Sequence, residues 1–174
     1  MKCNANFKIK GEVIDVLINT KTGERKEFRG NNIIVEGLSK LIAALMKRQD
    51  GFSGILYWEN GIGLPEWDSN PVDPSITDVS LVTPLYRKAI NKADIIFIDE
   101  NNEESIEMTN RLQISILFAE NESNGQLREL GIWGGDATGA LGSGVLINHR
   151  IHGVLTKTNE MILERKLRLS FELV

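Results

Sequence analysis

The sequence contains a single cysteine among its 174 residues, and this scarcity excludes two classes of small protein. One thiol cannot form an internal disulfide framework, and it cannot complete a zinc site built from several cysteines. The thiol itself, Cys3, lies close to the N-terminus, where a catalytic nucleophile is rarely held in position. The fold must therefore depend on its hydrophobic core, and size scaling predicts that about 70% of the chain's surface can be buried.

Long hydrophobic runs are also missing from the sequence. The longest apolar stretches, such as Ile95 to Ile98, are far too short to cross a bilayer. The first residues lead into a strand-like segment without the apolar core of a secretion signal. We therefore expect no membrane insertion, and we expect the chain to be made and folded in a cytoplasm.

Neither sign of charge dominates the composition. The chain has 24 acidic and 20 basic residues and a net charge of −4, which argues against general binding to the phosphate backbone of nucleic acids. Charged residues make up 25% and hydrophobic residues 41%, close to globular averages. We expect one globular domain over residues 1–174 with no nucleic-acid partner.

Proline is scarce, and all four prolines lie in one segment that is also rich in glycine, from Gly51 to Pro84. Glycine and proline interrupt this segment too often for long regular elements. It nevertheless contains Tyr57, Trp58 and Trp67, so it is more than a solvated linker. Long ordered loops in compact domains are usually functional or pack against a partner. This segment is the first candidate for a contact surface.

Alternating hydrophobicity dominates most of the remaining chain. Residues Ser105 to Phe118, and again Leu163 to Leu173, place apolar side chains largely on one parity and polar side chains on the other. Two-faced strands of this length indicate an antiparallel sheet. Further strands are expected at Gln126 to Trp133 and at Val145 to Thr156. We predict a mainly β fold, an antiparallel two-sheet sandwich.

Two other elements are expected in the first third of the chain. The segment Phe7 to Val35 predicts an antiparallel hairpin with a turn at Thr20 to Gly23, and it is a candidate docking arm. A helix packed on the sandwich is predicted over Gly37 to Arg48. Its apolar face is formed by residues spaced i, i+3, i+4, i+7 and i+8, namely Leu38, Leu41, Ile42, Leu45 and Met46.

Histidine is too scarce to suggest catalysis. Only His149 and His152 are present, and Gly142-Ser143-Gly144 is too short to be a nucleophile elbow. A spacing of three on a strand sends the two imidazoles to opposite faces. We therefore favour one half-buried and one surface histidine over a shared metal ion, although each could bind metal together with another chain.

Two loops could in principle hold an ion or a phosphate. The acidic segment from Asp68 to Asp78 has oxygen ligands, but Pro71 and Pro74 break the EF-hand pattern, and cation binding there stays open. The glycine-rich segment Gly134 to Gly139 lacks the Gly-Lys-Ser/Thr of a phosphate loop, and no helical pattern follows it. No pair of carboxylates is singled out for glycoside hydrolysis. We expect no cofactor and no enzymatic activity.

Four aromatic residues are candidates for an interface or a sugar contact, because large rigid rings bury much area at low entropic cost. They are Tyr57, Trp58, Trp67 and Trp133. The alternative is that the tryptophans belong to the core.

A structural ion pair is expected at Glu129, which lies in an otherwise apolar segment. A partly buried carboxylate needs a donor. The candidate partners are Arg128, its sequence neighbour, and also Arg87 or Lys157.

The order of several short motifs resembles a known family. Asn32-Ile33-Ile34-Val35-x-Gly37-Leu38, Gly61-Ile62-Gly63 and Pro74-Ser75-Ile76-Thr77-Asp78-x-x-Leu81 are followed by Asn124-Gly125-x-Leu127-Arg128-Glu129-Leu130-Gly131-Ile132-Trp133 and then by Lys157-Thr158 before the final strand. This order resembles that of bacteriophage tail-fibre, tail-collar and baseplate-associated proteins, over about residues 31–174.

The resemblance implies a non-enzymatic structural protein of the virion. Its place would be the viral tail, or a phage-like contractile particle, at the baseplate, collar or fibre connection. Its partners would be other tail or baseplate proteins, and virion assembly around a symmetric axis implies a homo-oligomer. The alternative is a carbohydrate-binding receptor module in which Trp58, Trp67 or Trp133 stacks on a host cell-surface sugar.

Overall fold

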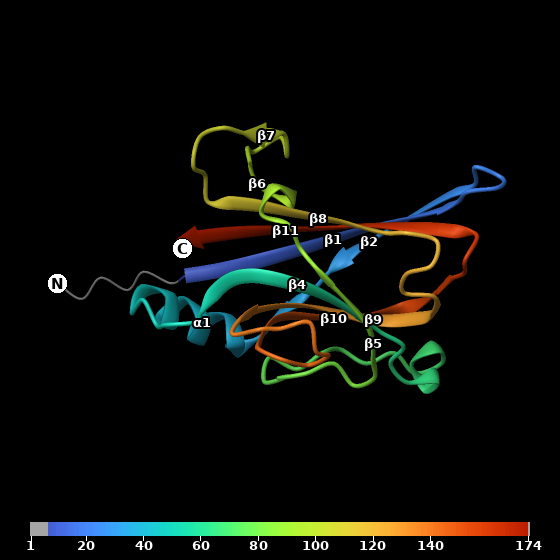
Figure 1. Cartoon of the computed structure of the whole chain (residues 1–174), viewed down its shortest axis with the longest axis horizontal. Coiled ribbons are helices and arrows are strands. Elements are labelled where there is room, and N and C mark those ends of the chain that lie inside the picture. Colours follow the sequence, from blue (N-terminus) through green and yellow to red (C-terminus); the bar gives the residue numbers. More distant parts are fainter. Residues whose placement is uncertain (1–6, 174) are drawn as a thin grey trace.

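Two antiparallel sheets face each other in the computed structural model, which describes residues 7–173 (Figure 1). Sheet A has the strand order β2-β1-β11-β8-β6-β7 and sheet B the order β3-β10-β9-β4-β5. Neither sheet is closed, and one helix packs against sheet B. The predicted mainly β sandwich with one packed helix is confirmed.

The strands of sheet A are β1 (Phe7–Asn19), β2 (Arg25–Asn31), β6 (Ile95–Ile98), β7 (Glu104–Ser105), β8 (Arg111–Phe118) and β11 (Met161–Leu173). Those of sheet B are β3 (Ile33–Ile34), β4 (Ser53–Gly61), β5 (Pro84–Ala89), β9 (Gly125–Gly135) and β10 (Val145–Lys157). The helical elements are α1 (Glu36–Met46) and two 3-10 turns, η1 (Pro65–Asp68) and η2 (Lys92–Asp94).

The predicted N-terminal hairpin is present as β1 and β2, and its first strand belongs to the core. The hairpin ends at Asn31, before the predicted Val35, because Ile33–Ile34 (β3) pair with β10 of sheet B. β1 pairs with β11 along its whole length, from Phe7 opposite Leu173 to Asn19 opposite Met161. Val13 of β1 is fully buried between the sheets. β2 lies at the edge of sheet A and is largely exposed. Docking of this hairpin onto a partner stays a prediction.

Helix α1 packs on β10 of sheet B through Leu38 and Leu41, which are both buried. The helix begins at Glu36, one residue before the predicted start at Gly37. It ends at Met46, two residues before the predicted end at Arg48. Gly37 permits the close approach, because a Cβ at this position would lie 2.0 Å from the carbonyl oxygen of Leu146. The apolar periodicity of the sequence therefore located the helix correctly.

The irregular segment between β4 and β5, residues 62–83, contains no strand and only the short turn η1. In Figure 1 it lies beside sheet B on the side away from sheet A. Trp67 and Leu81 of this segment are buried. It also contacts the helix, since the N–H of Glu36 donates to the carbonyl of Ile76. The segment is an ordered cover over the outer face of sheet B.

Within residues 7–173 no helix has the length and apolar character needed to span a membrane.

Candidate functional site

The three tryptophans predicted to contact a sugar or a partner are buried. Trp58 and Trp133 have no exposed surface, and Trp67 is 7% exposed. A side chain with little or no exposed surface has no face to offer a ligand. The three tryptophans are therefore core residues, which is the alternative that the sequence left open, and not an exposed contact surface. Trp58 packs between the sheets and its Nε1 donates to Asn60 Oδ1 (3.1 Å).

Tyr57 and Trp133 enclose an arginine instead of a ligand. The guanidinium of Arg87 lies 4.7 Å from the ring centroid of Tyr57 and 5.0 Å from that of Trp133. It also forms an ion pair with Glu59 (Nη1 to Oε2, 3.0 Å), and both side chains are almost completely buried. This arrangement combines cation–π contacts with a desolvated ion pair.

The loop between β9 and β10 closes over this ion pair. The N–H of Gly142 donates to Glu59 Oε2 (2.9 Å), and Arg87 Nη2 donates to the carbonyl of Ser143 (2.7 Å). The glycine-rich segment after Gly134 is therefore a connecting loop, as the sequence indicated, and it covers a buried charge pair. Three buried polar atoms here have no hydrogen-bond partner among the described residues: Glu59 Oε1, Arg87 Nε and Trp133 Nε1.

The expected ion pair between Glu129 and Arg128 is absent, and both alternative partners are also engaged elsewhere. Arg128 holds Asp68 with two bonds, Nε to Oδ1 at 2.9 Å and Nη2 to Oδ2 at 2.7 Å. Lys157 donates to the carbonyl of Ala119, and Arg87 pairs with Glu59 as described. The prediction was wrong because successive side chains on a strand point in different directions, so sequence neighbours seldom pair.

Glu129 instead pairs with His149 on the neighbouring strand. Its Oε2 lies 3.1 Å from Nε2 of His149, and its two oxygens accept the N–H groups of Val82 (3.0 Å) and Thr83 (2.7 Å). Burial alone would raise the pKa of Glu129, but these hydrogen bonds hold the pKa below its usual value. The carboxylate is therefore ionised, and both of its oxygens are engaged in hydrogen bonds.

His149 lies between two carboxylates. Its Nδ1 is 2.7 Å from Oδ2 of Asp78, so both ring nitrogens face an acid. Burial would lower the pKa of His149, but the bonds to Glu129 and Asp78 outweigh it and raise the pKa above its usual value. An imidazolium whose two ring nitrogens are both hydrogen-bonded to carboxylates has no nitrogen free to activate a nucleophile. The group connects the 62–83 segment to strands β9 and β10.

His152 occupies a different environment, so the two histidines form no common site. Its Nε2 faces Nη2 of Arg165 (3.2 Å), and burial, reinforced by the charge of Arg165, lowers the pKa of His152 to about 3. His149 is buried completely, at 1% exposure, where we expected one half-buried ring and one surface ring.

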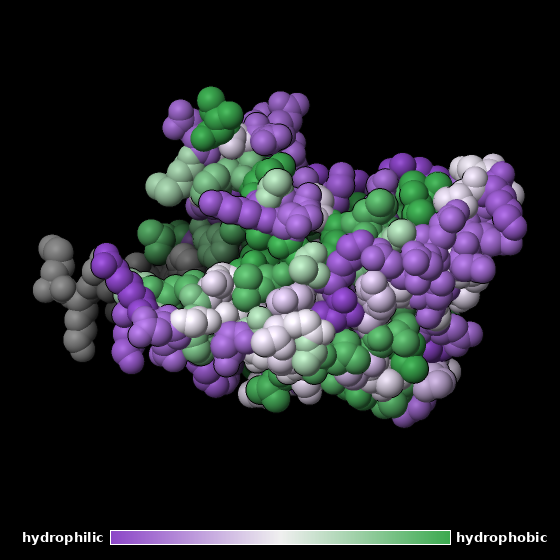
Figure 2. All heavy atoms as spheres, in the orientation of Figure 1, coloured by the Kyte–Doolittle hydropathy of each residue, from purple (hydrophilic) through white to green (hydrophobic). Residues whose placement is uncertain are grey.

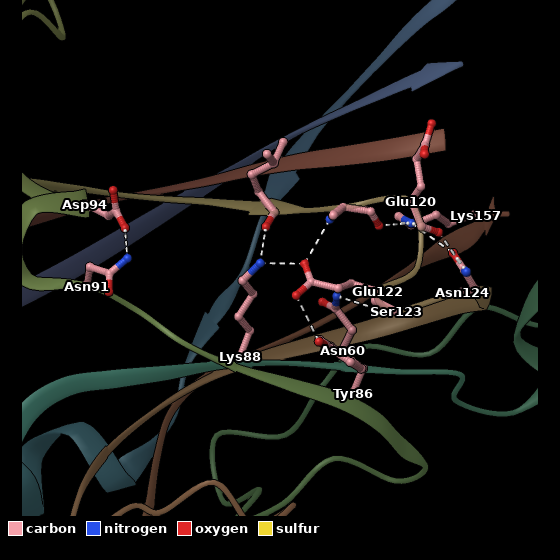
Figure 3. Close-up of polar contacts among 12 residues, drawn as sticks. Asn60, Tyr86, Lys88, Asn91, Asp94, Glu120, Glu122, Ser123, Asn124 and Lys157 are labelled. Carbon is pink, nitrogen blue, oxygen red and sulfur yellow. Dashed lines mark hydrogen bonds and ion pairs between the residues drawn. The ribbon is translucent and has the colours of Figure 1, made fainter. Parts of the chain in front are cut away.

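A second polar network lies between the sheets and holds the turn between β8 and β9 (Figure 3). Glu122 accepts bonds from Lys88 and from the hydroxyl of Tyr86. The contacts that complete the network are Asn60 Nδ2 to Ser123 Oγ (2.8 Å), Lys157 Nζ to Asn124 Oδ1 (2.9 Å) and Lys157 Nζ to Ala119 O (2.7 Å).

Arg165 is the functional-site candidate that sequence reasoning missed. It has no exposed surface and lies on the core-facing parity of β11, between Leu163 and Leu167. Its Nη1 donates to Asn60 Oδ1 (2.8 Å) and its Nε lies 3.4 Å from Oδ1 of Asp15. An arginine that interrupts an apolar parity was a visible signal, because such a position implies a buried charge with partners.

Metal ligation receives no support from the described part of the chain, where no group of three or more His, Cys, Asp and Glu residues is placed to hold a metal ion. Asp68 and Asp78, which we considered as cation ligands, are bonded to Arg128 and His149. Cys3 lies outside the described residues.

Comparisons with protein families, with curated proteins and with solved structures found no match for this chain.

Proposed function

We propose that this chain is a non-enzymatic structural subunit of a phage tail or of a phage-like contractile particle, at the baseplate, collar or fibre connection. The observation that supports this most is that charged residues of the motifs that carry the family resemblance form internal ion pairs. Asp78 belongs to one motif and Glu129 to another, and both bind His149. The motif residues thus serve to hold backbone segments together.

The first motif is connected to the same assembly. The N–H of Glu36 donates to the carbonyl of Ile76, and the N–H of Val35 donates to the carbonyl of Ile147 on β10. Charged groups that are engaged in internal ion pairs are poorly suited to catalysis, because a general acid or base must be able to reach the substrate. A rigid scaffold is well suited to a permanent assembly.

A candidate contact surface for neighbouring subunits is the loop around β7, residues 99–110, which projects from sheet A (Figure 1). It exposes Ile106 (99%) and Met108 (84%). Figure 2 shows hydrophobic atoms among hydrophilic ones on this projection. Its carboxylates are those of Asp99, Glu100, Glu103, Glu104 and Glu107. Apolar side chains within an acidic surround fit a partner that offers an apolar pocket with a basic rim.

Particle incorporation tests the proposal. An epitope-tagged wild-type chain is expected in tail particles purified from a producing culture, and the double variant Ile106→Ser, Met108→Ser is expected to be incorporated several-fold less. The matched control is Met46→Ser, which removes an apolar side chain of similar exposure (82%) at the end of α1. Absence of the wild-type chain from every purified particle would contradict the proposal.

The alternative, a carbohydrate-binding receptor module, has weaker support at the aromatic residues first considered. Trp58, Trp67 and Trp133 are buried, and the ring of Tyr57 is covered by Arg87. Saturable binding of host cell-surface polysaccharide that is lost in Trp67→Ala, with the fold retained, would favour this alternative.

A further inference from the structure

A cavity of about 280 Å³ opens between the two sheets at the edge formed by β2. It lies beside the register shift of β10 between Ile151 and Leu155. The residues that define it are Asp15 of β1, Phe28 and Arg29 of β2, and Arg150, His152 and Val154 of β10.

The floor of this cavity holds more positive than negative charge. Arg150, which lines the cavity, is 7% exposed. Arg165 is fully buried behind the lining and contacts the lining residues Asp15 and His152, and Asp15 is the one buried carboxylate among residues 7–173 that pairs with both arginines. Its Oδ1 lies 3.4 Å from Arg165 Nε and its Oδ2 lies 3.9 Å from Arg150 Nη1. One carboxylate thus serves two guanidinium groups. Buried charges without a full set of partners are costly, which makes an additional anion favourable.

The other titratable groups around the cavity do not change this balance. His152 is neutral, because its Nε2 faces an Arg165 N–H and its Nδ1 lies 2.7 Å from the carbonyl of Gly153, to which it donates. Arg29 at the mouth is half-exposed and is already paired with Glu27 (2.7 Å) and Glu12 (3.6 Å). The excess positive charge is therefore that of the buried arginines.

Arg150 has few protein partners for its five N–H donors. Its one hydrogen bond within the described residues runs from Nη1 to the carbonyl of Val13 and is long, at 3.5 Å. The group is nevertheless held in place, because its Nη2 fills the space beside Gly30, where a Cβ would lie 2.7 Å away. Arg150 is at the same time one of the residues that line the cavity.

We propose that this cavity binds the carboxylate of a small acidic sugar, such as a uronic acid, with Arg150 as the carboxylate-binding residue. A guanidinium offers two parallel N–H groups that match a carboxylate. The rim carries Phe28 (40% exposed) and Val154 (42% exposed), which suit the apolar C–H face of a sugar ring. The volume admits one ring but not a long oligosaccharide. This inference does not depend on the chain being a tail subunit.

Calorimetric titration of the full-length chain with sodium glucuronate tests the site, with glucose as the uncharged analogue at equal ionic strength. Saturable binding of glucuronate is expected, with glucose weaker by about tenfold or more, since a charge-assisted hydrogen bond contributes about 1.5–3 kcal/mol. Sodium propionate and sodium phosphate serve as competitors. If either binds as tightly as glucuronate, the acidic-sugar assignment is overturned in favour of a general carboxylate or oxyanion site.

Two variants test the location. Arg150→Gln is expected to lower the affinity for glucuronate by about tenfold or more, whereas Arg25→Gln, which removes the same charge from the exposed part of β2, is expected to leave it unchanged. Val154→Trp places a large side chain at the mouth of the cavity. If Arg150→Gln does not fold, loss of glucuronate binding in Val154→Trp tests the location instead. Absence of glucuronate binding by the wild type, or full binding by Val154→Trp, would overturn the proposal.

Discussion

Glu129 and His149 face each other across neighbouring strands of sheet B, with Oε2 3.1 Å from Nε2 and no more than 1% of either residue exposed. Asp78 binds the other ring nitrogen from the 62–83 segment. This acid–imidazolium–acid group holds a long irregular segment on a sheet, so we expect the stability of that segment to depend on its ionisation.

The stability of the 62–83 segment should depend on pH in both directions. The pKa of His149 is raised, so its contribution is complete below its unfolded value of about 6.5 and is lost as the pH rises through the folded value. The pKa of Glu129 is lowered, so its contribution is present above about 4.3 and is lost as the pH falls through the folded value. Protection of the Val82 and Thr83 amides from hydrogen exchange, relative to their intrinsic rates at each pH, should be greatest between these limits. In His149→Gln the loss on the alkaline side should disappear; an unchanged alkaline loss would assign it to another group.

Removal of the Glu129 charge should destabilise the whole domain. In Glu129→Gln the buried imidazolium loses one of its two acids and the amides of Val82 and Thr83 lose a charged acceptor, so we expect a loss of about 3 kcal/mol in the free energy of unfolding. Urea denaturation monitored by tryptophan fluorescence measures it. The control is Glu172→Gln at the exposed pair with Lys10, where a change below about 1 kcal/mol is expected. Equal effects of the two changes would refute a special role for Glu129.

The buried pair of Glu59 and Arg87 should show strong coupling. Arg87→Met leaves the Glu59 carboxylate buried without its cation and should cost about 3–5 kcal/mol. The double variant Glu59→Gln, Arg87→Met removes both charges and should be more stable than Arg87→Met alone. A double-mutant cycle by thermal or chemical denaturation measures the difference. Strict additivity of the two single changes would contradict direct coupling.

Gly37→Ala separates helix propensity from packing. Alanine favours a helix over glycine by about 1 kcal/mol, yet the added Cβ would lie 2.0 Å from the carbonyl oxygen of Leu146. We expect the clash to prevail and the melting temperature to fall, with a cost of about 1–3 kcal/mol. Gly54→Ala, where an added Cβ meets no atom within 4 Å, is the matched control and should be nearly neutral.

Deletion of residues 1–31 tests the role of the N-terminal hairpin. Because β1 pairs with β11 along 13 residues and buries Val13 and Leu17, we expect the truncated chain to lose its cooperative thermal transition. Circular dichroism during heating measures this. An unchanged melting temperature combined with lost assembly would instead identify the hairpin as a docking arm alone.

The sequence by itself determined the elements that depend on local pattern. Alternation over Leu163 to Leu173 located β11, and the spacing of Leu38, Leu41 and Leu45 located α1, because burial of one face imposes a fixed period on a strand or helix. The density of glycine and proline likewise predicted an irregular segment from Gly51 to Pro84, which is correct for residues 62–83 but wrong for β4 (Ser53–Gly61), a strand paired on both sides within sheet B.

Only the tertiary structure decided which polar groups meet. Glu129 is 20 residues from His149, Asp78 is 71 residues from it, and Arg165 is 105 residues from Asn60. No local period encodes such pairs, since they follow from strand order and from the path of the 62–83 segment over sheet B. The burial of Trp58 and Trp133 was decided in the same way, because a side chain's exposure depends on what packs above its strand, and that is set by distant parts of the chain.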